Sequence, residues 1–271
     1  MSGTPYAEVI GDPIAQSKSP LIHKFWLDAL GKAGDYRRAH IKPQDLAAYF
    51  SERRFDPDWR GCNVTIPHKV AVMDLVDDPG NIRGTIGAMN TIVRQPDGSV
   101  IGTNTDAAGF YGPLAELDLD GAPVALVGAG GAARAVLFAL ARANVGHVTI
   151  LNRSPLKAMG LLATFGLKGD VVQLDAALPP VQLLVNSSSL GMTGQPPLDL
   201  DLSPLPDDAI IYDLVYAPLQ TGLLKAAAAR GLDTVDGLDM LIGQAALAFE
   251  LFFGAPPPEG RDDELRGLLT A

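Results

Sequence analysis

The stretch Val124-Ala-Leu-Val-Gly128-Ala-Gly130-Gly-Ala-Ala133 decides the fold of the second half of the chain. It follows the pattern G-x-G-x-x-A, between an apolar run and an Ala/Leu-rich segment that continues to about Ala143. This pattern is typical of a strand, a tight turn at Gly128 and a helix, with room for a pyrophosphate at Gly130 and close helix packing at Ala133. The first N–H groups of such a helix bind phosphates. The stretch therefore predicts a dinucleotide-binding turn, the alternative being a glycine-rich turn without a ligand.

The segment after the next apolar run indicates which dinucleotide binds. An NAD site places Asp or Glu about 20 residues after the turn, where the acid binds the ribose 2′-hydroxyl. The sequence there is Leu151-Asn152-Arg153-Ser154, which contains no acid. The Arg153 guanidinium suits a 2′-phosphate, Asn152 and Ser154 can add hydrogen bonds, and Lys157 can add a charge. The segment favours NADP, and the alternative is that Arg153 is a solvated loop charge.

Short runs rich in Val and Ile recur along the chain, and helical patterns lie between most of them. The runs span residues 7–10, 36–41, 62–66, 91–94 and 100–101, and then 124–127, 148–151, 171–174, 183–185, 210–212 and 234–235. Alternation at this spacing predicts parallel sheets with crossover helices. We expect two sheets, with a connecting helix over residues 106–119 and the second domain beginning near Asp106.

The C-terminal region contains one strongly apolar helical pattern. Its apolar residues recur at helical spacing and are Leu238, Leu241, Ile242, Ala245, Phe249 and Phe252. Much of the opposite face is also apolar, so we expect this helix to be buried and to return to the first domain. Residues 261–269 are expected to form a short exposed helix. The predicted fold class is α/β with two domains, residues 1–105 plus 238–271 and residues 106–237.

Composition and charge exclude several classes of protein. Of 271 residues, 47% are hydrophobic and 19% charged, which favours a well-filled core over disorder. The net charge of −10 leaves no basic stripe for nucleic acid. Neither an apolar run of about 18 residues nor a signal-peptide pattern is present, so we expect no membrane span. The single cysteine, Cys62, allows no internal disulfide, and we expect a cytoplasmic protein.

The histidines suggest no metal site. His23, His40, His68 and His147 are scattered without metal-ligand spacing. His68 precedes Lys69, but we interpret His68 as structural because neighbours in sequence face different directions on a helix.

The segment Gly11-Asp-Pro-Ile-Ala-Gln-Ser17-Lys-Ser19-Pro20 connects a predicted strand to a predicted helix. Ser19 fits the N-cap and Pro20 the N1 position, so capping alone could explain Ser19. The same arrangement of hydroxyl groups and a helix N-terminus suits a carboxylate. Both interpretations remain open.

The segment Asn63-Val-Thr65-Ile-Pro67-His-Lys69 begins at the end of a predicted strand. We expect Pro67 to open a helix, with Lys69 in its first turn. A cation there opposes the helix dipole, and a residue placed against this local preference indicates a functional role. The alternative is a solvated surface lysine.

Further polar residues occur where packing alone does not require them. Asn90 precedes a predicted strand, and Thr105 or Asp106 either caps the connecting helix or binds a ligand. Gln244 lies in the apolar C-terminal helix, where a buried amide needs a partner. Tyr216 follows a predicted strand, at the end where α/β sheets bind ligands.

Taken together, these segments resemble the shikimate dehydrogenase family, in order from Gly11 to Gly254. The matching segments are Gly11 to Pro20, Asn63 to Lys69, Gly87-Ala-Met-Asn90-Thr91, Asn104-Thr105-Asp106, Gly128 to Ala133, Asn152-Arg153-Ser154, Tyr212-Asp-Leu-Val-Tyr216 and Gly237 to Ala246. The resemblance implies reversible reduction of 3-dehydroshikimate to shikimate with NADPH in aromatic biosynthesis. It also implies an N-terminal substrate domain, a doubly wound Rossmann domain, and a C-terminal helix that returns to the first domain.

The resemblance also implies roles for individual residues. Those matched to substrate binding are Ser17 and Ser19 for the carboxylate, with help from Tyr216, and Thr65, Lys69, Asn90, Asp106 and Gln244 for the ring hydroxyls. Lys69 and Asp106 match the catalytic pair. Those matched to NADP(H) are Gly128, Ala129, Gly130, Gly131, Ala132, Asn152, Arg153, Ser154, Lys157, Ser187, Ser188, Gly237 and Met240. Lys157 stands where the family often has Arg, which replaces a bidentate contact by a point charge.

Two alternatives stay open. One is a quinate/shikimate dehydrogenase of the same family that uses NAD or NADP. The other is a non-catalytic NADP-binding regulator on the same scaffold, although Lys69 and Asp106 are both present. We expect a small-molecule substrate, no nucleic-acid or membrane partner, and a monomer or homodimer.

Overall fold

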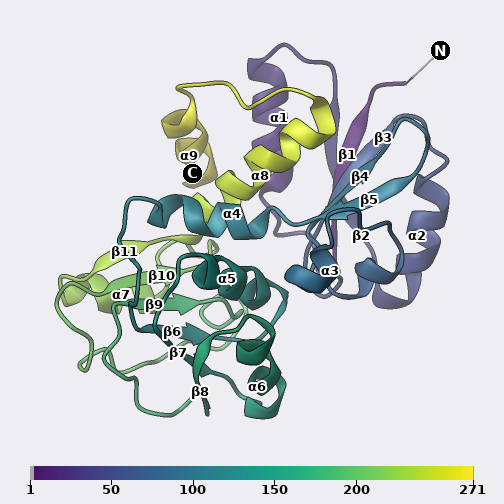
Figure 1. Ribbon diagram of the computed structural model, residues 1–271. Helices are drawn as coiled ribbons and strands as arrows, with labels where there is room; N and C mark the ends of the chain where they lie inside the picture. Colours follow the sequence, from purple (N-terminus) through teal and green to yellow (C-terminus); the bar gives the residue numbers. More distant parts are fainter. Residues whose placement is uncertain (1–2, 271) are drawn as a thin grey trace. The chain divides into compact units, whose positions relative to one another are not determined.

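The computed structural model describes residues 3–270, apart from the side chain of Lys157. The chain divides into two compact units, Met1–Thr105 with Ile242–Ala271 and Asp106–Leu241. Each is an α/β unit built around its own sheet, as the alternating pattern predicts (Figure 1). The chain re-enters the first unit at Ile242, whereas the sequence placed this return at residue 238.

The first unit contains a five-stranded sheet in the order β2-β1-β3-β4-β5 (Figure 1). Its strands are β1 (Tyr6–Gly11), β2 (Asp35–His40), β3 (Trp59–Val64), β4 (Thr91–Arg94) and β5 (Val100–Thr103). β1 is parallel to β2 and β3, whereas β4 is antiparallel to both β3 and β5. The expectation of a wholly parallel sheet is therefore wrong here, because the short link between β4 and β5 cannot hold a crossover helix.

Helices cover both faces of this sheet. The helices of this unit are α1 (Ser19–Ala29), α2 (Leu46–Arg53), the short α3 (Ile82–Thr85), most of α8 (Gly237–Phe253) and α9 (Asp262–Thr270). Under α2, the Glu8 carboxylate is 4% exposed and accepts hydrogen bonds from the Tyr49 hydroxyl at 2.8 Å and Arg53 Nε at 2.9 Å. A buried carboxylate with such partners avoids most of the cost of desolvation.

The terminal helix α9 is not exposed in the way the sequence suggested. Leu265 and Leu269 are spaced one turn apart and are both buried, and the helix packs against α1. Its charged residues stay on the other face, which explains why composition alone suggested a solvated helix.

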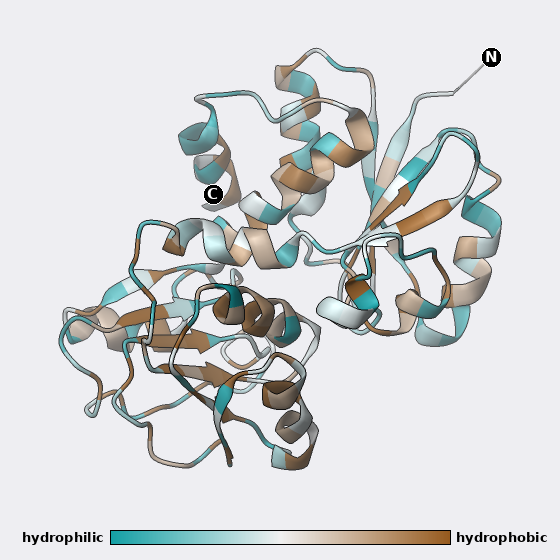
Figure 2. Ribbon diagram, in the orientation of Figure 1, coloured by the Kyte–Doolittle hydropathy of each residue, from teal (hydrophilic) through white to brown (hydrophobic). Residues whose placement is uncertain are grey.

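The second unit contains six strands that are all parallel, in the order β11-β10-β9-β6-β7-β8. These are β6 (Val124–Val127), β7 (His147–Leu151), β8 (Lys168–Val172), β9 (Leu183–Asn186), β10 (Ile210–Asp213) and β11 (Asp233–Val235). β6 and β9 are buried along their whole length, and Figure 2 shows the apolar character of the central strands. Burial on both faces is typical of a doubly wound parallel sheet.

The helices of the second unit form the two outer layers. α5 (Gly131–Arg142) and α6 (Pro155–Thr164) cover one core, and α7 (Gly222–Ala229) covers the other. α4 (Asp106–Tyr111) packs against α5 and is shorter than the predicted 106–119 helix. It gives way to a 3-10 turn at Gly112–Leu114, because Pro113 cannot supply the N–H that continues a helix.

Within residues 3–270, no helix combines the length and apolar character that crossing a membrane requires.

One buried histidine gives the first unit a pH-sensitive core. The ring of His23 stacks on Tyr36 with centroids 3.9 Å apart, and Phe249 and Trp26 lie around it. Among the described residues, neither ring nitrogen of His23 has a hydrogen-bond partner, and burial lowers the pKa of His23 to about 3. The folded protein therefore holds the neutral imidazole.

We predict that the free energy of unfolding falls as the pH drops from about 6.5 towards 3, because only the unfolded chain then protonates His23. The expected slope from this group is about 1.4 kcal/mol per pH unit. Urea unfolding at pH 7.5 and pH 5.0 measures it. His23→Phe should remove about 2 kcal/mol of the difference between the two conditions.

His147→Gln is the matched control, because His147 is exposed. An equal loss of stability between pH 7.5 and 5.0 in the wild type and in His23→Phe contradicts the prediction.

Candidate functional site

The turn after β6 has the geometry of a phosphate-binding turn. Gly128 has a φ of +103°, and a Cβ there would lie 3.1 Å from the Ser187 hydroxyl oxygen and 3.2 Å from the Ser188 backbone nitrogen. Gly130 is extended, precedes α5, and has open space where its Cβ would lie. No described side chain caps α5, so its first N–H groups are available to an anion.

The small residues of this turn differ in exposure. Ala129, Gly131 and Ala132 are partly exposed, whereas Ala133 is buried against the sheet. This division is what the G-x-G-x-x-A pattern requires, because the first residues face a ligand and the last one packs helix on strand.

A cavity of about 180 Å³ opens beside the turn. It is lined by Val127, Gly128, Leu151, Asn152, Arg153, Leu174, Ser188, Ser189 and Leu190. Arg153 is exposed at its rim, and Asn152 Nδ2 donates to the Ser154 carbonyl oxygen at 2.9 Å. None of these lining residues carries a carboxylate. The cavity therefore suits a nucleotide that bears an additional phosphate.

The predicted residue Lys157 belongs to α6 by its backbone, but its side chain lies outside the described part of the structure.

A polar network behind the cavity fixes the loop that follows β9. Asn186 Nδ2 donates to Asp213 Oδ1 at 2.8 Å, and the Thr221 hydroxyl donates to Asp213 Oδ2 at 2.7 Å. The Ser188 hydroxyl donates to Asn186 Oδ1 at 2.7 Å, and the Ser187 hydroxyl donates to the Val127 carbonyl oxygen at 2.8 Å. Burial raises the pKa of Asp213. This network holds Ser187 and Ser188 against the Gly128 turn.

Sequence reasoning did not single out the centre of this network. Asn186 and Asp213 are the last residues of two buried strands, and polar residues at that position are the signal that could have found them.

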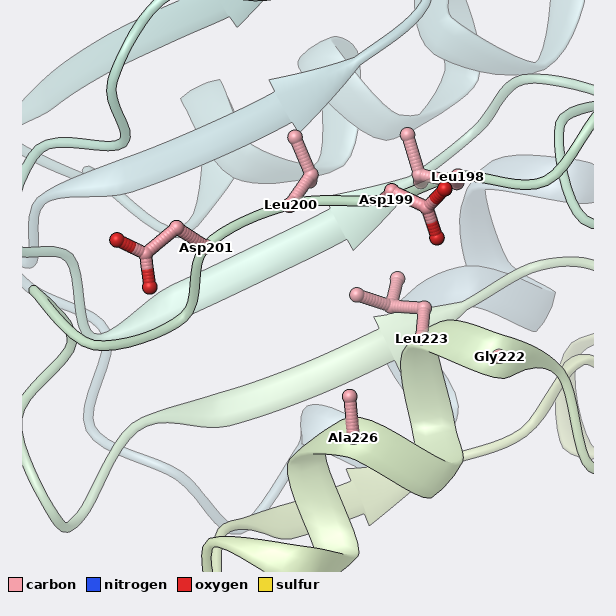
Figure 3. A pocket seen from close by; sticks show the side chains of 7 residues that line it. All are labelled: Leu198, Asp199, Leu200, Asp201, Gly222, Leu223 and Ala226. Atoms are coloured by element: carbon pink, nitrogen blue, oxygen red, sulfur yellow. The ribbon is translucent and has the colours of Figure 1, made fainter.

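A second, larger cavity of about 320 Å³ lies between residues 198–201 and α7 (Figure 3). Leu198, Leu200 and Leu223 form its apolar part, and the Asp199 and Asp201 carboxylates lie on the 198–201 segment. Its lining includes none of the predicted site residues. Carboxylates also disfavour the phosphates of a dinucleotide, so the smaller cavity is the candidate cofactor site.

In the first unit, the segment after β3 lies against the end of β1. Thr65 N donates to the Ile10 carbonyl oxygen at 3.0 Å, and a Cβ on Gly11 would lie 2.6 Å from Thr65 Cγ2. Thr65 and Lys69 are partly exposed, so both can meet a ligand.

The expected helix at Pro67 is wrong. The described chain forms a turn over residues 66–70 that contains the cis Ile66–Pro67 peptide, and a 3-10 segment follows at Ala71–Asp74. The dipole argument for Lys69 therefore fails. The backbone of Lys69 is held instead by Met89, whose N–H donates to the Lys69 carbonyl oxygen at 2.7 Å.

His68 is 1% exposed, and its Nε2 lies 2.7 Å from the Ile41 carbonyl oxygen. This contact ties the turn to the end of β2, in keeping with a structural role.

The two serines of the first loop are buried side by side. Ser17 and Ser19 are 6% and 4% exposed, and their hydroxyl oxygens are 3.3 Å apart. α1 begins at Ser19, with Lys18 at the N-cap and no side-chain cap, so the alternative in which Ser19 is the N-cap is wrong. The paired hydroxyl groups at a helix start form a site that suits a carboxylate.

A buried amide cluster completes the polar residues of this unit. Asn90 Oδ1 accepts from Thr105 N at 2.7 Å, and Asn90 Nδ2 donates to Gln244 Oε1 at 3.3 Å. Val64 N donates to the Asn90 carbonyl oxygen at 2.7 Å, which links the cluster to the end of β3. The buried amide of Gln244 thus has a polar partner, as its position in an apolar helix required.

The remaining predicted residues belong to the second unit. Asp106 is buried and is the first residue of α4, and Tyr216 is partly exposed after β10. Met240 is buried in the core that also contains residues of α5. At the start of α8, a Cβ on Gly237 would lie 2.4 Å from the Leu214 carbonyl oxygen, so this position requires glycine.

Three stretches of the chain match known protein families. Residues 9–92 match a shikimate dehydrogenase substrate-binding domain, residues 114–189 a shikimate/quinate 5-dehydrogenase, and residues 237–261 a shikimate 5′-dehydrogenase C-terminal domain.

Individual relatives extend over almost the whole chain. The NADP⁺ shikimate dehydrogenase of Sphingopyxis alaskensis is 87% identical over 268 residues, which cover 99% of this chain and 98% of the relative. The shikimate 5-dehydrogenase of Thermus thermophilus, solved with NADP(H) and shikimate, is 36% identical with a TM-score of 0.86, covering 98% of this chain and 99% of that one. The quinate dehydrogenase of Corynebacterium glutamicum, solved with NAD, is 31% identical with a TM-score of 0.87, covering 98% and 99%. The chain therefore belongs to the shikimate dehydrogenase family.

Proposed function

We propose that this protein is an NADP-dependent shikimate dehydrogenase, which reversibly reduces 3-dehydroshikimate to shikimate in aromatic biosynthesis. The observation that carries this assignment is the 87% identity to an NADP⁺ shikimate dehydrogenase over nearly the whole chain. The cavity beside Gly128, with Arg153 and no acid in its lining, supports the cofactor.

The second unit is proposed to hold NADP(H). The residues fit this group because Gly128 permits the turn that a side chain would block, and Gly130 leaves open space before the uncapped start of α5. In this proposal Ala129, Gly131 and Ala132 line the pyrophosphate, and Asn152, Arg153, Ser154 and Lys157 hold the 2′-phosphate. Ser187, Ser188, Gly237 and Met240 would hold the nicotinamide part of the cofactor.

The substrate is proposed to bind to residues that belong mostly to the first unit. Ser17 and Ser19 would hold its carboxylate with help from Tyr216. Thr65, Asn90 and Gln244 would bind ring hydroxyl groups together with Lys69 and Asp106. Neutral donors and acceptors predominate in this set, which suits a small polyhydroxylated acid.

The proposed mechanism requires one proton transfer by the protein. NADPH, held by the residues named above, would supply the hydride that the reduction of the substrate carbonyl requires. Lys69 donates a proton to the carbonyl oxygen during reduction and accepts it from the hydroxyl group during oxidation. Asp106 binds the neighbouring hydroxyl group and so fixes the carbonyl in position.

The cellular compartment and the oligomeric state are also proposed. We propose that it acts in the cytoplasm, in support of which Cys62 is a buried free thiol. We propose a monomer or homodimer, which light scattering measures directly.

Substrate and cofactor preference test the assignment directly. Absorbance of reduced nicotinamide is followed with shikimate or quinate, each with NADP⁺ or NAD⁺. We expect the highest kcat/KM for shikimate with NADP⁺. Turnover only with quinate and NAD⁺ favours the alternative within the family, and the absence of turnover with every pair contradicts the enzyme assignment.

Replacement of the proposed acid should remove chemistry and retain binding. We predict that Lys69→Ala lowers kcat about 10²–10⁴-fold, because proton transfer to the carbonyl oxygen then lacks its donor. Steady-state rates give kcat, and calorimetry gives the Kd of shikimate. Lys42→Ala, at an exposed lysine of the same unit, is the control. Unchanged turnover in Lys69→Ala excludes the catalytic role.

Replacement of Arg153 should weaken only the phosphorylated cofactor. We predict that Arg153→Ala raises the KM of NADP⁺ about 10- to 100-fold, the effect of one charge-assisted phosphate contact. The KM of NAD⁺ should change less than about twofold, since NAD⁺ lacks the 2′-phosphate.

Arg142→Ala removes an exposed arginine from the end of α5 and serves as the control. A proportional rise of both KM values in Arg153→Ala contradicts a specific 2′-phosphate contact.

A further inference from the structure

The loop between β1 and α1 is fastened to β2 by an arginine. Arg38 Nε and Nη2 donate to the Ser17 carbonyl oxygen at 2.9 and 2.5 Å. Arg38 lies two residues after Tyr36 on β2, so both side chains point to the same face of the sheet. Tyr36 stacks on His23 of α1, which identifies that face as the one that α1 covers. The arginine therefore fixes the backbone of Ser17 from the sheet side.

The next residue is fastened to the other end of the chain. Lys18 Nζ donates to the Leu269 carbonyl oxygen in the last turn of α9. The last four carbonyl groups of a helix have no partner within the helix and carry its negative dipole end, so a lysine is well suited to this position. The contact makes α9 part of the support of the loop.

α9 is itself held firmly on α1. Leu265 and Leu269 are 0% and 1% exposed, and the Arg261 guanidinium lies 5.2 Å from the ring centroid of Phe25. Phe25 belongs to α1, the helix that the Ser17–Ser19 segment begins. Two cations thus support the loop. Arg38 reaches the loop from the sheet, and Lys18 reaches from the loop to the docked helix α9.

These contacts are made by the Ser17 carbonyl oxygen and by the side chain of Lys18, which lies between the two serines. They do not use the serine hydroxyl groups. A carboxylate binds tightly only where its donors are already oriented, because ordering the donors on binding consumes part of the binding free energy. The two hydroxyl oxygens are 3.3 Å apart, and Ser19 N donates to the Ser17 hydroxyl oxygen at 3.3 Å. A rotation of the Ser17 peptide would separate them.

We propose that Arg38 and Lys18, the latter through α9, are positioning residues that hold the Ser17 and Ser19 hydroxyl groups ready for the substrate carboxylate. This inference rests on the proposed function, since it takes shikimate as the ligand. Removing either cation leaves the chemistry intact and lowers the fraction of enzyme whose loop can bind a carboxylate.

The test compares Arg38→Met, Arg38→Lys and Lys18→Met with the wild type. Lys32→Met is the matched control, since Lys32 is exposed in the same unit. Initial rates are measured with shikimate, with its methyl ester, which lacks the negative charge, and with varied NADP⁺. Melting temperatures report folding.

We expect Arg38→Met and Lys18→Met to raise the KM of shikimate about three- to tenfold, the effect of one net hydrogen bond. The kcat and the KM of NADP⁺ should stay within about twofold. The preference for shikimate over its methyl ester should fall by the same factor as KM rises, and Arg38→Lys should recover part of the loss.

An unchanged KM of shikimate in Arg38→Lys and Lys18→Met overturns the inference, and these two variants decide it if Arg38→Met fails to fold. An equal rise of KM for shikimate and its ester also overturns it, because the effect is then not directed at the carboxylate. Failure of the wild type to oxidise shikimate overturns the proposed function as well, whereas an active wild type with unaffected variants overturns the positioning role alone.

Discussion

Parallel pairing of strands is the constraint on which both units depend. The carboxyl ends of parallel strands meet at one edge of a sheet, so segments that are distant in sequence leave the sheet close together. In the first unit the loops after β1, β2 and β3 meet in this way. Asp12 N, after β1, donates to the Ile66 carbonyl oxygen, after β3, at 3.0 Å, and His68 Nε2 lies 2.7 Å from the Ile41 carbonyl oxygen, after β2. In the second unit the Gly128 turn, the 152–154 segment and the loop after β9 leave the same edge. Each candidate site is built at such an edge.

Hydrogen bonds between buried polar groups fix the loops that leave this edge of each sheet. Asp213 accepts hydrogen bonds from Asn186 and Thr221, and thereby joins the ends of β9 and β10 to the start of α7. Burying a carboxylate is costly, and its raised pKa reflects that cost, but three donors including Val215 N offset it. In the first unit Asn90 has the same function with neutral groups. The loops are therefore held by specific geometry that apolar packing alone does not provide.

Local patterns predicted the parts of the structure that depend on local physics. The apolar strands and the Gly128 turn follow from burial and from a backbone that excludes side chains, and both are present, although β8 spans Lys168–Val172 where the sequence predicts a strand at 171–174. The helix predicted at Pro67 is wrong because a proline after a strand fits a helix start and a turn equally well. Lys18 and Arg38 gave no signal at all, because their partners, Leu269 and the Ser17 carbonyl, are chosen by the tertiary fold.

This contrast explains why the proposed cofactor site is easier to recognise from the sequence than the proposed substrate site. A pyrophosphate is bound chiefly by backbone N–H groups, so its site is recorded as contiguous glycines. A polyhydroxylated acid is bound by side chains that converge from separate loops, and each of them also has a structural explanation. Lys69 illustrates the difficulty, since the helix that made it conspicuous does not form. Its proposed role now rests on partial exposure, on a turn anchored to Met89, and on the matching of the whole ordered set of segments. Such a site is identified from sequence only when many positions agree, each of which is inconclusive alone.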